Sequence, residues 1–188
     1  MGGRVERLPA DGDGGRQVVL IDLDNDWQWP VDADLDWFIA FLAVDAVGVP
    51  SDRIASLAKA MLGRRCAYVS VWGPESQRVH DTFDRVYETE WSHPRPEAGE
   101  WSQDVPFLMS TWHDDESLAS GLWFSLMDAN PSADGYWMRG HRRSRRWRTR
   151  STAPWFAICY STGTALTLRQ TTPARDRPFA WASVLSPE

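Results

Sequence analysis

The sequence is poor in the residues that build disulfide frameworks and metal clusters. Among its 188 residues are only two cysteines, Cys66 and Cys159, and four histidines. Each cysteine lies inside an apolar segment, and neither has a histidine or a second cysteine at the spacing of zinc ligands. This pattern excludes a disulfide scaffold and predicts two small core residues in a reducing compartment. Two of the histidines, His80 and His141, are expected to be solvated.

Long apolar runs are lacking as well. The first fifteen residues contain no hydrophobic stretch of the kind that a signal peptide needs. No later run approaches the roughly 18 apolar residues that span a bilayer. We therefore expect a cytoplasmic protein with no membrane partner. The glycine-rich phosphate loop and the Gly-x-Ser-x-Gly nucleophile elbow are also missing, which removes two common classes of enzyme from consideration.

Basic residues are scarce in the first part of the chain and abundant in the last. Residues 1–136 hold 10 basic and 24 acidic residues, a net charge of −14, whereas residues 137–188 hold 10 basic and 2 acidic residues, a net charge of +8. An acidic body repels nucleic acid, so a nucleic-acid partner would have to bind the arginine-rich stretch 142–150. A solvated loop is the more common role of such a charge run. We expect another protein as the partner.

Apolar segments followed by turn residues predict the strands of a sheet. Four of them cover residues 37–44, 66–72, 105–111 and 154–160, and the β-branched run 17–23 predicts a fifth strand. Helical periodicity lies between them. The clearest case is residues 51–62, where Ser51 is the expected N-cap and five apolar residues form one stripe: Ile54, Leu57, Ala58, Met61 and Leu62.

Two further helices are predicted over residues 75–87 and 115–129, and the first of them has the apolar stripe Val79, Phe83 and Val86. Strands that alternate with helices imply right-handed crossovers and a parallel sheet. The predicted fold is therefore a three-layer α/β domain with a mostly parallel sheet of four or five strands and helices on both faces. We expect a flexible N-terminus over residues 1–15 and a single domain over residues 16–161. The domain contains a basic insertion at residues 138–152, and an irregular tail follows at residues 162–188.

Acidic and imidazole groups follow three of the predicted strands. The carboxyl ends of parallel strands meet at one edge of a sheet, where ligands of such folds bind. His113 is a candidate base or metal ligand, and carboxylates near it would suit Mg²⁺ or Mn²⁺. The candidate catalytic residues are His113, Asp114, Asp115, Glu116, Asp45 and Glu75, of which Asp115, Glu116 and His113 are also the candidate metal ligands.

The run His113–Glu116 has a second interpretation that needs no chemistry. Acidic residues in the first turn of a helix accept hydrogen bonds from its free N–H groups and complement its dipole. We expect Asp114 to be the N-cap of the third helix, and we favour this interpretation over a metal site.

Twelve tryptophans are many for a chain of this length. An indole buries a large area, so several of them should anchor the core while others mark a contact surface. Trp72 and Trp112 lie at the ends of predicted strands and are the candidate partner surface.

Two segments resemble a known family. They are "CAYVSVWGPE" at 66–75 and "FLMSTWHDDESLASGLWFSL" at 107–126, and with the strand and helix before them they resemble an uncharacterised family of small bacterial α/β domains, a domain of unknown function. The resemblance covers about Trp37 to Asn130, with a weaker match over "PWFAICYSTG". It is most specific at the strand end Trp72–Gly73 and at Thr111–Glu116. It implies a fold and a compartment and carries no activity, and the arginine-rich insertion departs from the pattern.

Two functions from different classes remain open. The leading hypothesis is a non-enzymatic intracellular binding or regulatory module without a cofactor, for example an immunity-type partner of another protein. The alternative is a metal-dependent hydrolase or phosphotransfer enzyme that uses Mg²⁺ or Mn²⁺ at the carboxyl edge of the sheet. Convergence of Asp45, Glu75, His113 and Asp115 in one pocket would favour the enzyme.

Overall fold

One sheet of six strands carries the three helices, within the residues that the computed structural model describes: 4–8, 17–23, 25–35, 37–91, 108–129 and 155–161. The strands are β1 (Val5–Arg7), β2 (Gln17–Asp22), β3 (Phe38–Ala43), β4 (Cys66–Trp72), β5 (Met109–His113) and β6 (Trp155–Tyr160). The helices are α1 (Ser51–Leu62), α2 (Ser76–Glu90) and α3 (Leu118–Met127). All neighbouring strands are parallel except β1 and β2. The predicted α/β class and mostly parallel sheet are confirmed.

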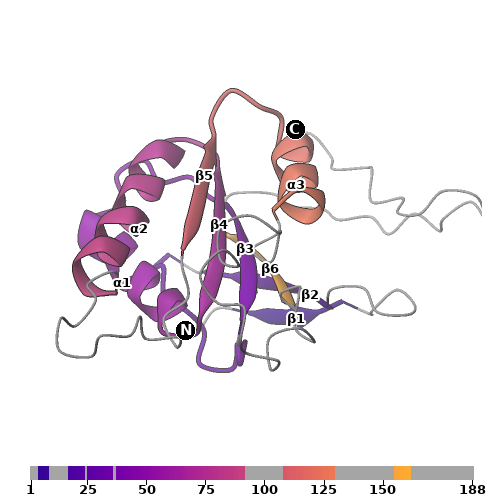
Figure 1. The fold of residues 1–188 in the computed structure, drawn as a ribbon, viewed down its shortest axis with the longest axis horizontal. Coiled ribbons are helices and arrows are strands. Elements are labelled where there is room, and N and C mark those ends of the chain that lie inside the picture. The colour runs from indigo at the N-terminus through magenta and orange to yellow at the C-terminus, as the bar shows by residue number, and fades with distance from the viewer. Residues whose placement is uncertain are drawn as a thin grey trace, which may run out of the picture.

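The helices lie on opposite faces of the sheet. Figure 1 shows α1 and α2 on one side of the strands and α3 on the other. The central strand β3 is buried along its whole length because its alternating side chains enter two separate cores. Phe38, Ala40 and Leu42 pack toward α1 and α2, whereas Ile39 and Phe41 pack toward α3. A continuous apolar run is what a strand covered on both faces requires.

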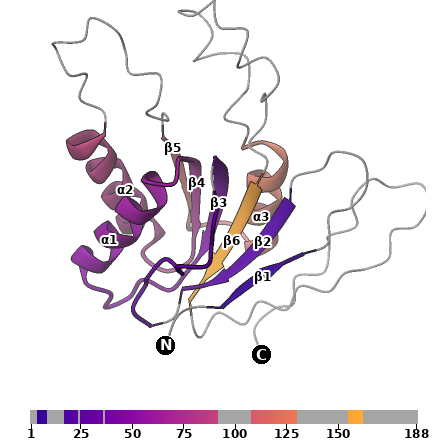
Figure 2. The ribbon, with the colours of Figure 1, turned by 90° about the horizontal axis from the view of Figure 1, so that it is seen from below.

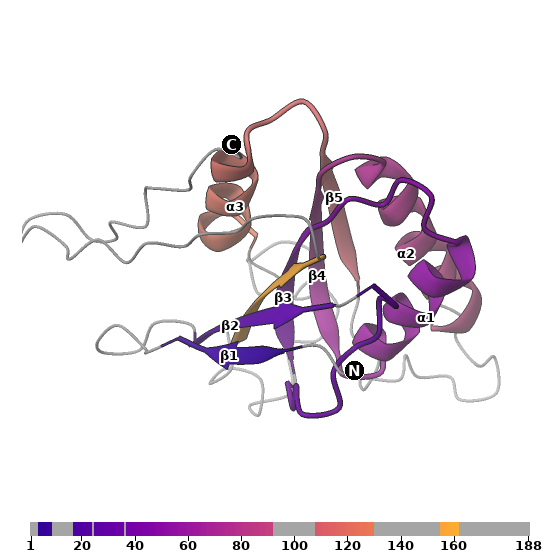
Figure 3. The ribbon, with the colours of Figure 1, turned by 180° about the vertical axis from the view of Figure 1, so that it is seen from behind.

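The order of the strands in the sheet is β1-β2-β6-β3-β4-β5. The chain moves from β3 to β4 to β5 through α1 and α2, and then returns through α3 to insert β6 between β2 and β3. Figure 2 shows the strands in this row, and Figure 3 shows β1 at the edge opposite to β5. The two edge strands of the sheet are therefore β1 and β5.

Helices α1 and α2 are buried along the predicted stripes. All five predicted stripe residues of α1 are buried, and so are Val79, Phe83 and Val86 of α2. Both helices pack on the same face of the sheet, in the same core as the strand residues Val69 and Val71. The start of α1 was predicted wrongly, because Pro50 and not Ser51 is the N-cap. Pro50, whose ring fixes its φ, takes the extended N-cap position, and Ser51 is the first helical residue.

Two strands differ from the prediction. The expected strand 105–111 runs further than predicted, since β5 (Met109–His113) continues through His113 alongside β4, with Tyr68 opposite Met109 and Trp72 opposite His113, while residues 105–107 lie outside the described residues. Pairing with β4 extends the strand to His113, where the sequence pattern indicates the start of a helix. The sixth strand, β1, was not predicted and lies in the expected N-terminal segment, where it pairs antiparallel with β2. The expected basic insertion and irregular tail lie outside the described residues.

Gly73 is required where β4 ends. Its φ is +117°, a region that favours glycine, and an added Cβ would lie 2.2 Å from the carbonyl oxygen of Val44. The neighbouring Val44 N–H donates to the carbonyl of Trp72 at 3.0 Å. The Trp72–Gly73 strand end therefore allows the loop after β3 to lie directly against β4.

Both cysteines lie in the core as predicted, and neither forms a disulfide. Burial raises the pKa of the Cys66 thiol and of the Cys159 thiol. Among the described residues, no helix combines the length and the apolar character that crossing a membrane requires.

Candidate functional site

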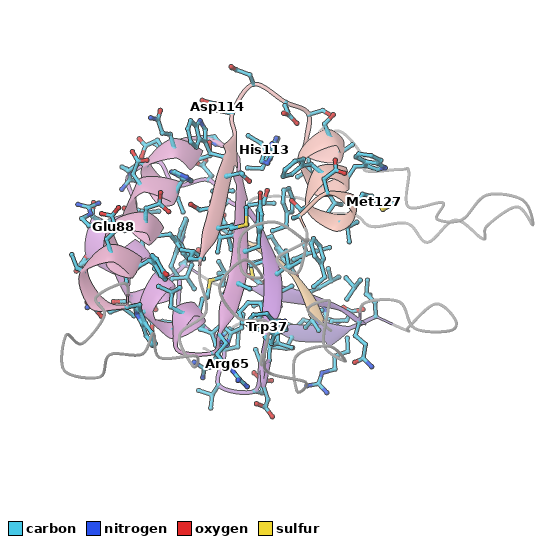
Figure 4. All side chains as sticks on the ribbon, in the orientation of Figure 1. Trp37, Arg65, Glu88, His113, Asp114 and Met127 are labelled. Carbon is cyan, nitrogen blue, oxygen red and sulfur yellow. The ribbon has the colours of Figure 1, made fainter. Side chains whose placement is uncertain are left out.

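The run His113–Glu116 joins the end of β5 to α3. His113 is the last residue of β5, and residues 114–116 form bends that lead across the end of the sheet. Figure 4 places His113 at the top of β5 and Asp114 in the loop above it. The helix begins only after Ser117, whose Oγ accepts a hydrogen bond from the Ser120 N–H at 3.2 Å. The prediction that Asp114 caps this helix is wrong, because a serine hydroxyl three residues later takes that role.

His113 is buried between β5 and α3. Its ring centroid lies 5.0 Å from that of Phe124 on α3. Its Nδ1 is 3.5 Å from Oε2 of Glu116, and its Nε2 is 3.3 Å from Oγ1 of Thr111. Gly121 favours the close approach of α3 to the sheet, since an added Cβ there would lie 3.3 Å from Cε2 of Phe41, a tight contact. The imidazole is thus held between a hydroxyl and a carboxylate.

Further hydroxyl groups extend this polar row into the sheet. The Thr111 hydroxyl donates to Oγ of Ser70 at 3.3 Å, and Ser70 is fully buried. Tyr68 also hydrogen-bonds the Thr111 side chain. Burial raises the pKa of Tyr68, and the hydrogen bond from Thr111 lowers it by a smaller amount. A connected polar network therefore lies between β4, β5 and α3, where it satisfies groups that are removed from water.

Trp72 holds the loop after β5 in place. Its indole Nε1 donates to the backbone carbonyl of Glu116 at 2.8 Å. The ring is half-buried and packs against the core under α3. Of the two candidate partner residues, Trp72 therefore has a structural contact of its own, and Trp112 is the more exposed one.

Asp45 and Glu75 are engaged in loop structure. An Asp45 carboxylate oxygen accepts the Val47 N–H at 3.0 Å, which forms a local turn. Glu75 has a φ of 60° and forms an ion pair with Arg78, with 2.6 Å between Oε2 and Nη2. Arg78 also donates to the carbonyls of Ala46 and Val49. These contacts tie the loop after β3 to the start of α2.

The candidate ligands do not assemble into a metal site. Within the described parts of the chain, no group of three or more histidine, cysteine, aspartate or glutamate side chains is placed to hold a metal ion. All six candidate residues belong to those parts. The structure brings together His113 and Glu116, and it leaves Asp114 and Asp115 without an ion pair or side-chain hydrogen bond to the described residues.

The α2 side of β5 carries contacts that sequence reasoning missed. His80 of α2 is buried against Trp112, with ring centroids 4.6 Å apart, so the expectation that it is solvated was wrong. Its two ring nitrogens lie 3.0 Å from Asp81 and 3.5 Å from Asp84. The missed signal is helical spacing, because His80 precedes the core residue Phe83 by three positions.

Four large apolar side chains remain exposed on β5 and α3. Met109 and Trp112 of β5 keep 41% and 43% of their surface exposed. Trp123 and Met127, one turn apart on α3, keep 60% and 50%. Figure 4 shows Met127 on the side of α3 that points away from β5. Two of the exposed residues therefore lie on the edge strand β5 and two lie on α3.

A comparison with protein families gives one match. The family model described as a domain of unknown function (DUF7684) matches residues 18–136, a range that runs from β2 to beyond the end of α3. No curated protein and no solved structure matches the chain.

Proposed function

The chain belongs to the DUF7684 family, a domain of unknown function, and from this premise we propose that it is a non-enzymatic, intracellular module that binds and regulates another protein. The partner contacts the outer edge of β5. Two free, buried thiols support a reducing compartment for this role. The proposal requires no cofactor.

The observation that carries this proposal is the open edge of β5. In the described part of the structure β5 pairs with β4 alone, so the backbone groups along its other side have no strand beside them. Such an edge is a template for another chain. Met109 and Trp112 provide exposed apolar side chains at the same edge. Tryptophan and methionine are enriched in the cores of protein interfaces.

The proposal is tested by capture of partners from an extract of the source cells, with three forms of the full chain. We expect the wild type to retain a specific protein that the Trp112→Ala variant loses, since exposed tryptophans are frequent energetic centres of interfaces. The matched control is Trp123→Ala on α3, which removes an equally large exposed indole from a different surface. No specific protein, or equal capture by Trp112→Ala, would overturn the proposal.

A hydrolase is the second candidate, and one specific observation favours it. Thr111, His113 and Glu116 place a hydroxyl, an imidazole and a carboxylate in the order of a nucleophile, a general base and an orienting acid. Such a hydrolase would use Thr111, His113 and Glu116. It would not use Asp45 or Glu75, because the carboxylates of those two residues bind within their own loops. The Thr111 hydroxyl would turn from Ser70 to donate to His113 and would attack an acyl or phosphoryl centre. His113 would accept its proton and pass it to the leaving group as the bond to that group breaks, and water would then release the acyl or phosphoryl group from Thr111 with His113 as the base.

Covalent labelling separates this candidate from the binding module. If Thr111, His113 and Glu116 are catalytic, a fluorophosphonate probe should modify Thr111 in the wild type. The variants Thr111→Val and His113→Gln should both abolish this labelling. Intact mass measurement reports the adduct directly. If the wild type is not labelled, the hydrolase hypothesis is wrong. Thr111, His113 and Glu116 then form a network that satisfies buried polar groups.

A further inference from the structure

We propose that the partner of the β5 edge is an extended basic segment that adds to the sheet as a seventh strand beside β5. This inference rests on the proposed function and names the chemistry of its partner. In strand addition the backbone hydrogen bonds supply affinity, and pockets for alternate side chains supply specificity.

The two edges of the sheet are built differently. The edge strand β1 has three residues, of which Glu6 and Arg7 are charged. Shortness and charge are the usual protection of an edge against pairing with another chain. Strand β5, "MSTWH", has five residues and contains no lysine, arginine, glutamate, aspartate or proline. The single lysine of the sequence, Lys59, lies on α1. Among the strands that the structure describes, β5 is therefore the edge without such protection.

The side chains of β5 present different surfaces to the two faces of an added strand. Ser110 and Trp112 point toward α2, where they contact Asp84 and His80 respectively. His113 points toward α3, and by alternation Met109 lies on the same face. A strand beside β5 would place alternate residues next to Trp112 on one face and next to Met109 on the other.

Acidic groups surround this edge. Asp81 and Asp84 lie beside Trp112 through their contacts with His80, and 58% and 44% of their side-chain surfaces are exposed. Asp114 and Asp115 follow the last residue of β5 and have no ion pair or side-chain hydrogen bond within the described residues. A partner strand with lysine or arginine side chains would neutralise these acids, and one with acidic side chains would be repelled.

The same charges argue against a second copy of this chain as the partner. If two β5 strands paired edge to edge in the parallel sense, Asp114 and Asp115 of one copy would lie beside the same residues of the other. Like charges placed opposite one another across strands are destabilising. The acidic rim therefore favours a basic strand over a second β5.

The test uses a fluorescent nine-residue peptide in which valine alternates with lysine or arginine. Fluorescence anisotropy at low ionic strength reports its binding to the full chain. We expect saturable binding that weakens with added salt, because the ion pairs at this rim are exposed. A first control peptide carries glutamate at the basic positions and should bind at least tenfold more weakly. A second is the basic peptide N-methylated at alternate residues, which keeps the charge and removes N–H donors, and it should lose a similar factor.

Variants of the protein locate the site. The double variant Asp114→Asn/Asp115→Asn should weaken binding of the basic peptide about three- to tenfold at low salt, a loss of the size that two exposed ion pairs give. The matched control is Asp32→Asn/Asp34→Asn, which removes two exposed carboxylates from the loop before β3. Hydrogen exchange of the amides of residues 109–113 should slow when the peptide binds, and this readout requires no variant to fold.

The possible outcomes separate this inference from the proposed function. Equal binding of the basic and acidic peptides, or full binding of the N-methylated peptide, would overturn the addition of a basic strand. If Trp112→Ala still lost the native partner in that case, protein binding at β5 would stand without strand addition. Binding of the basic peptide with slowed exchange in β5, lost on N-methylation, supports the inference directly.

Discussion

At the scale of the residue, Arg78 joins the start of α2 to the loop after β3, two segments that lie far apart in the sequence. Its guanidinium donates to Glu75 and to the carbonyls of Ala46 and Val49. Removing the guanidinium takes away its charged hydrogen bonds to this loop, so Arg78→Ala should lower the free energy of unfolding by about 2 kcal/mol. Urea denaturation measures this loss. The control is Arg85→Ala, which within the described residues removes a donor to Thr82 alone and should cost less than about 0.5 kcal/mol.

Two glycines with positive φ provide a matched pair for separating steric clash from backbone strain. Gly48 has a φ of +72° with open space around it, so Gly48→Ala carries only the conformational cost of about 1 kcal/mol. Gly73→Ala carries a similar cost and also drives a Cβ to 2.2 Å from the Val44 carbonyl oxygen. We expect it to lose at least about 3 kcal/mol, by the same urea measurement. Similar losses for the two variants would contradict the clash.

At the scale of the element, the start of α3 is set by Ser117. Loss of an N-cap side chain costs about 1 kcal/mol, so Ser117→Ala should lower the stability by that amount. Asp114 lies before the helix and bonds to none of its N–H groups in the described structure, so Asp114→Ala should change the stability by less than about 0.5 kcal/mol. Thermal denaturation of the two variants measures both. A larger loss at Asp114 than at Ser117 would mean that the helix begins earlier.

The same boundary shows where sequence reasoning works for an element and where it does not. The stripes of α1 and α2 were predicted residue by residue because each helix has one apolar face and one polar face. Helix α3 is apolar on most sides, so its periodicity carries little information about its ends. Strand β5 continues through Trp112 and His113 because β4 lies beside it, and a pairing partner from elsewhere in the chain leaves no local signal.

At the scale of the whole molecule, the α/β class of the fold could be predicted from the alternation of strands and helices in the sequence. The insertion of β6 beside β3 could not be, because strand order is decided by packing between distant segments. The short charged strand β1 escaped prediction for a similar reason, since it has no apolar run of its own. The six candidate site residues lie at or just beyond the carboxyl ends of β3, β4 and β5, but they do not come together at one point. His113 and Glu116 meet, while Asp45 and Glu75 hold their own loops.

Burial of neutral titratable groups predicts how the whole molecule responds to alkaline pH. Burial is the main cause that raises the pKa of Cys66, Cys159, Tyr68, Tyr87 and Tyr160. A raised pKa means that the folded state keeps a proton that the unfolded state releases, so the stability is fully present below the unfolded pKa and is lost as pH rises above it. Unfolded thiols release protons near pH 8.5 and tyrosines near pH 10. The free energy of unfolding should therefore stay level with respect to these groups up to about pH 8 and then fall.

The double variant Cys66→Ala/Cys159→Ala isolates the thiol contribution to that fall. With the thiols absent, the groups with raised pKa that remain are tyrosines, so the decline should begin about one pH unit higher, although the variant starts from a lower stability because two buried side chains are truncated. Urea denaturation at a series of pH values gives the onset for both proteins. Ultraviolet absorbance of tyrosinate in the native protein should lag behind that of the urea-unfolded chain as pH rises. Coincident titration of the folded and unfolded tyrosines would contradict their burial and with it the packing of β4, α2 and β6.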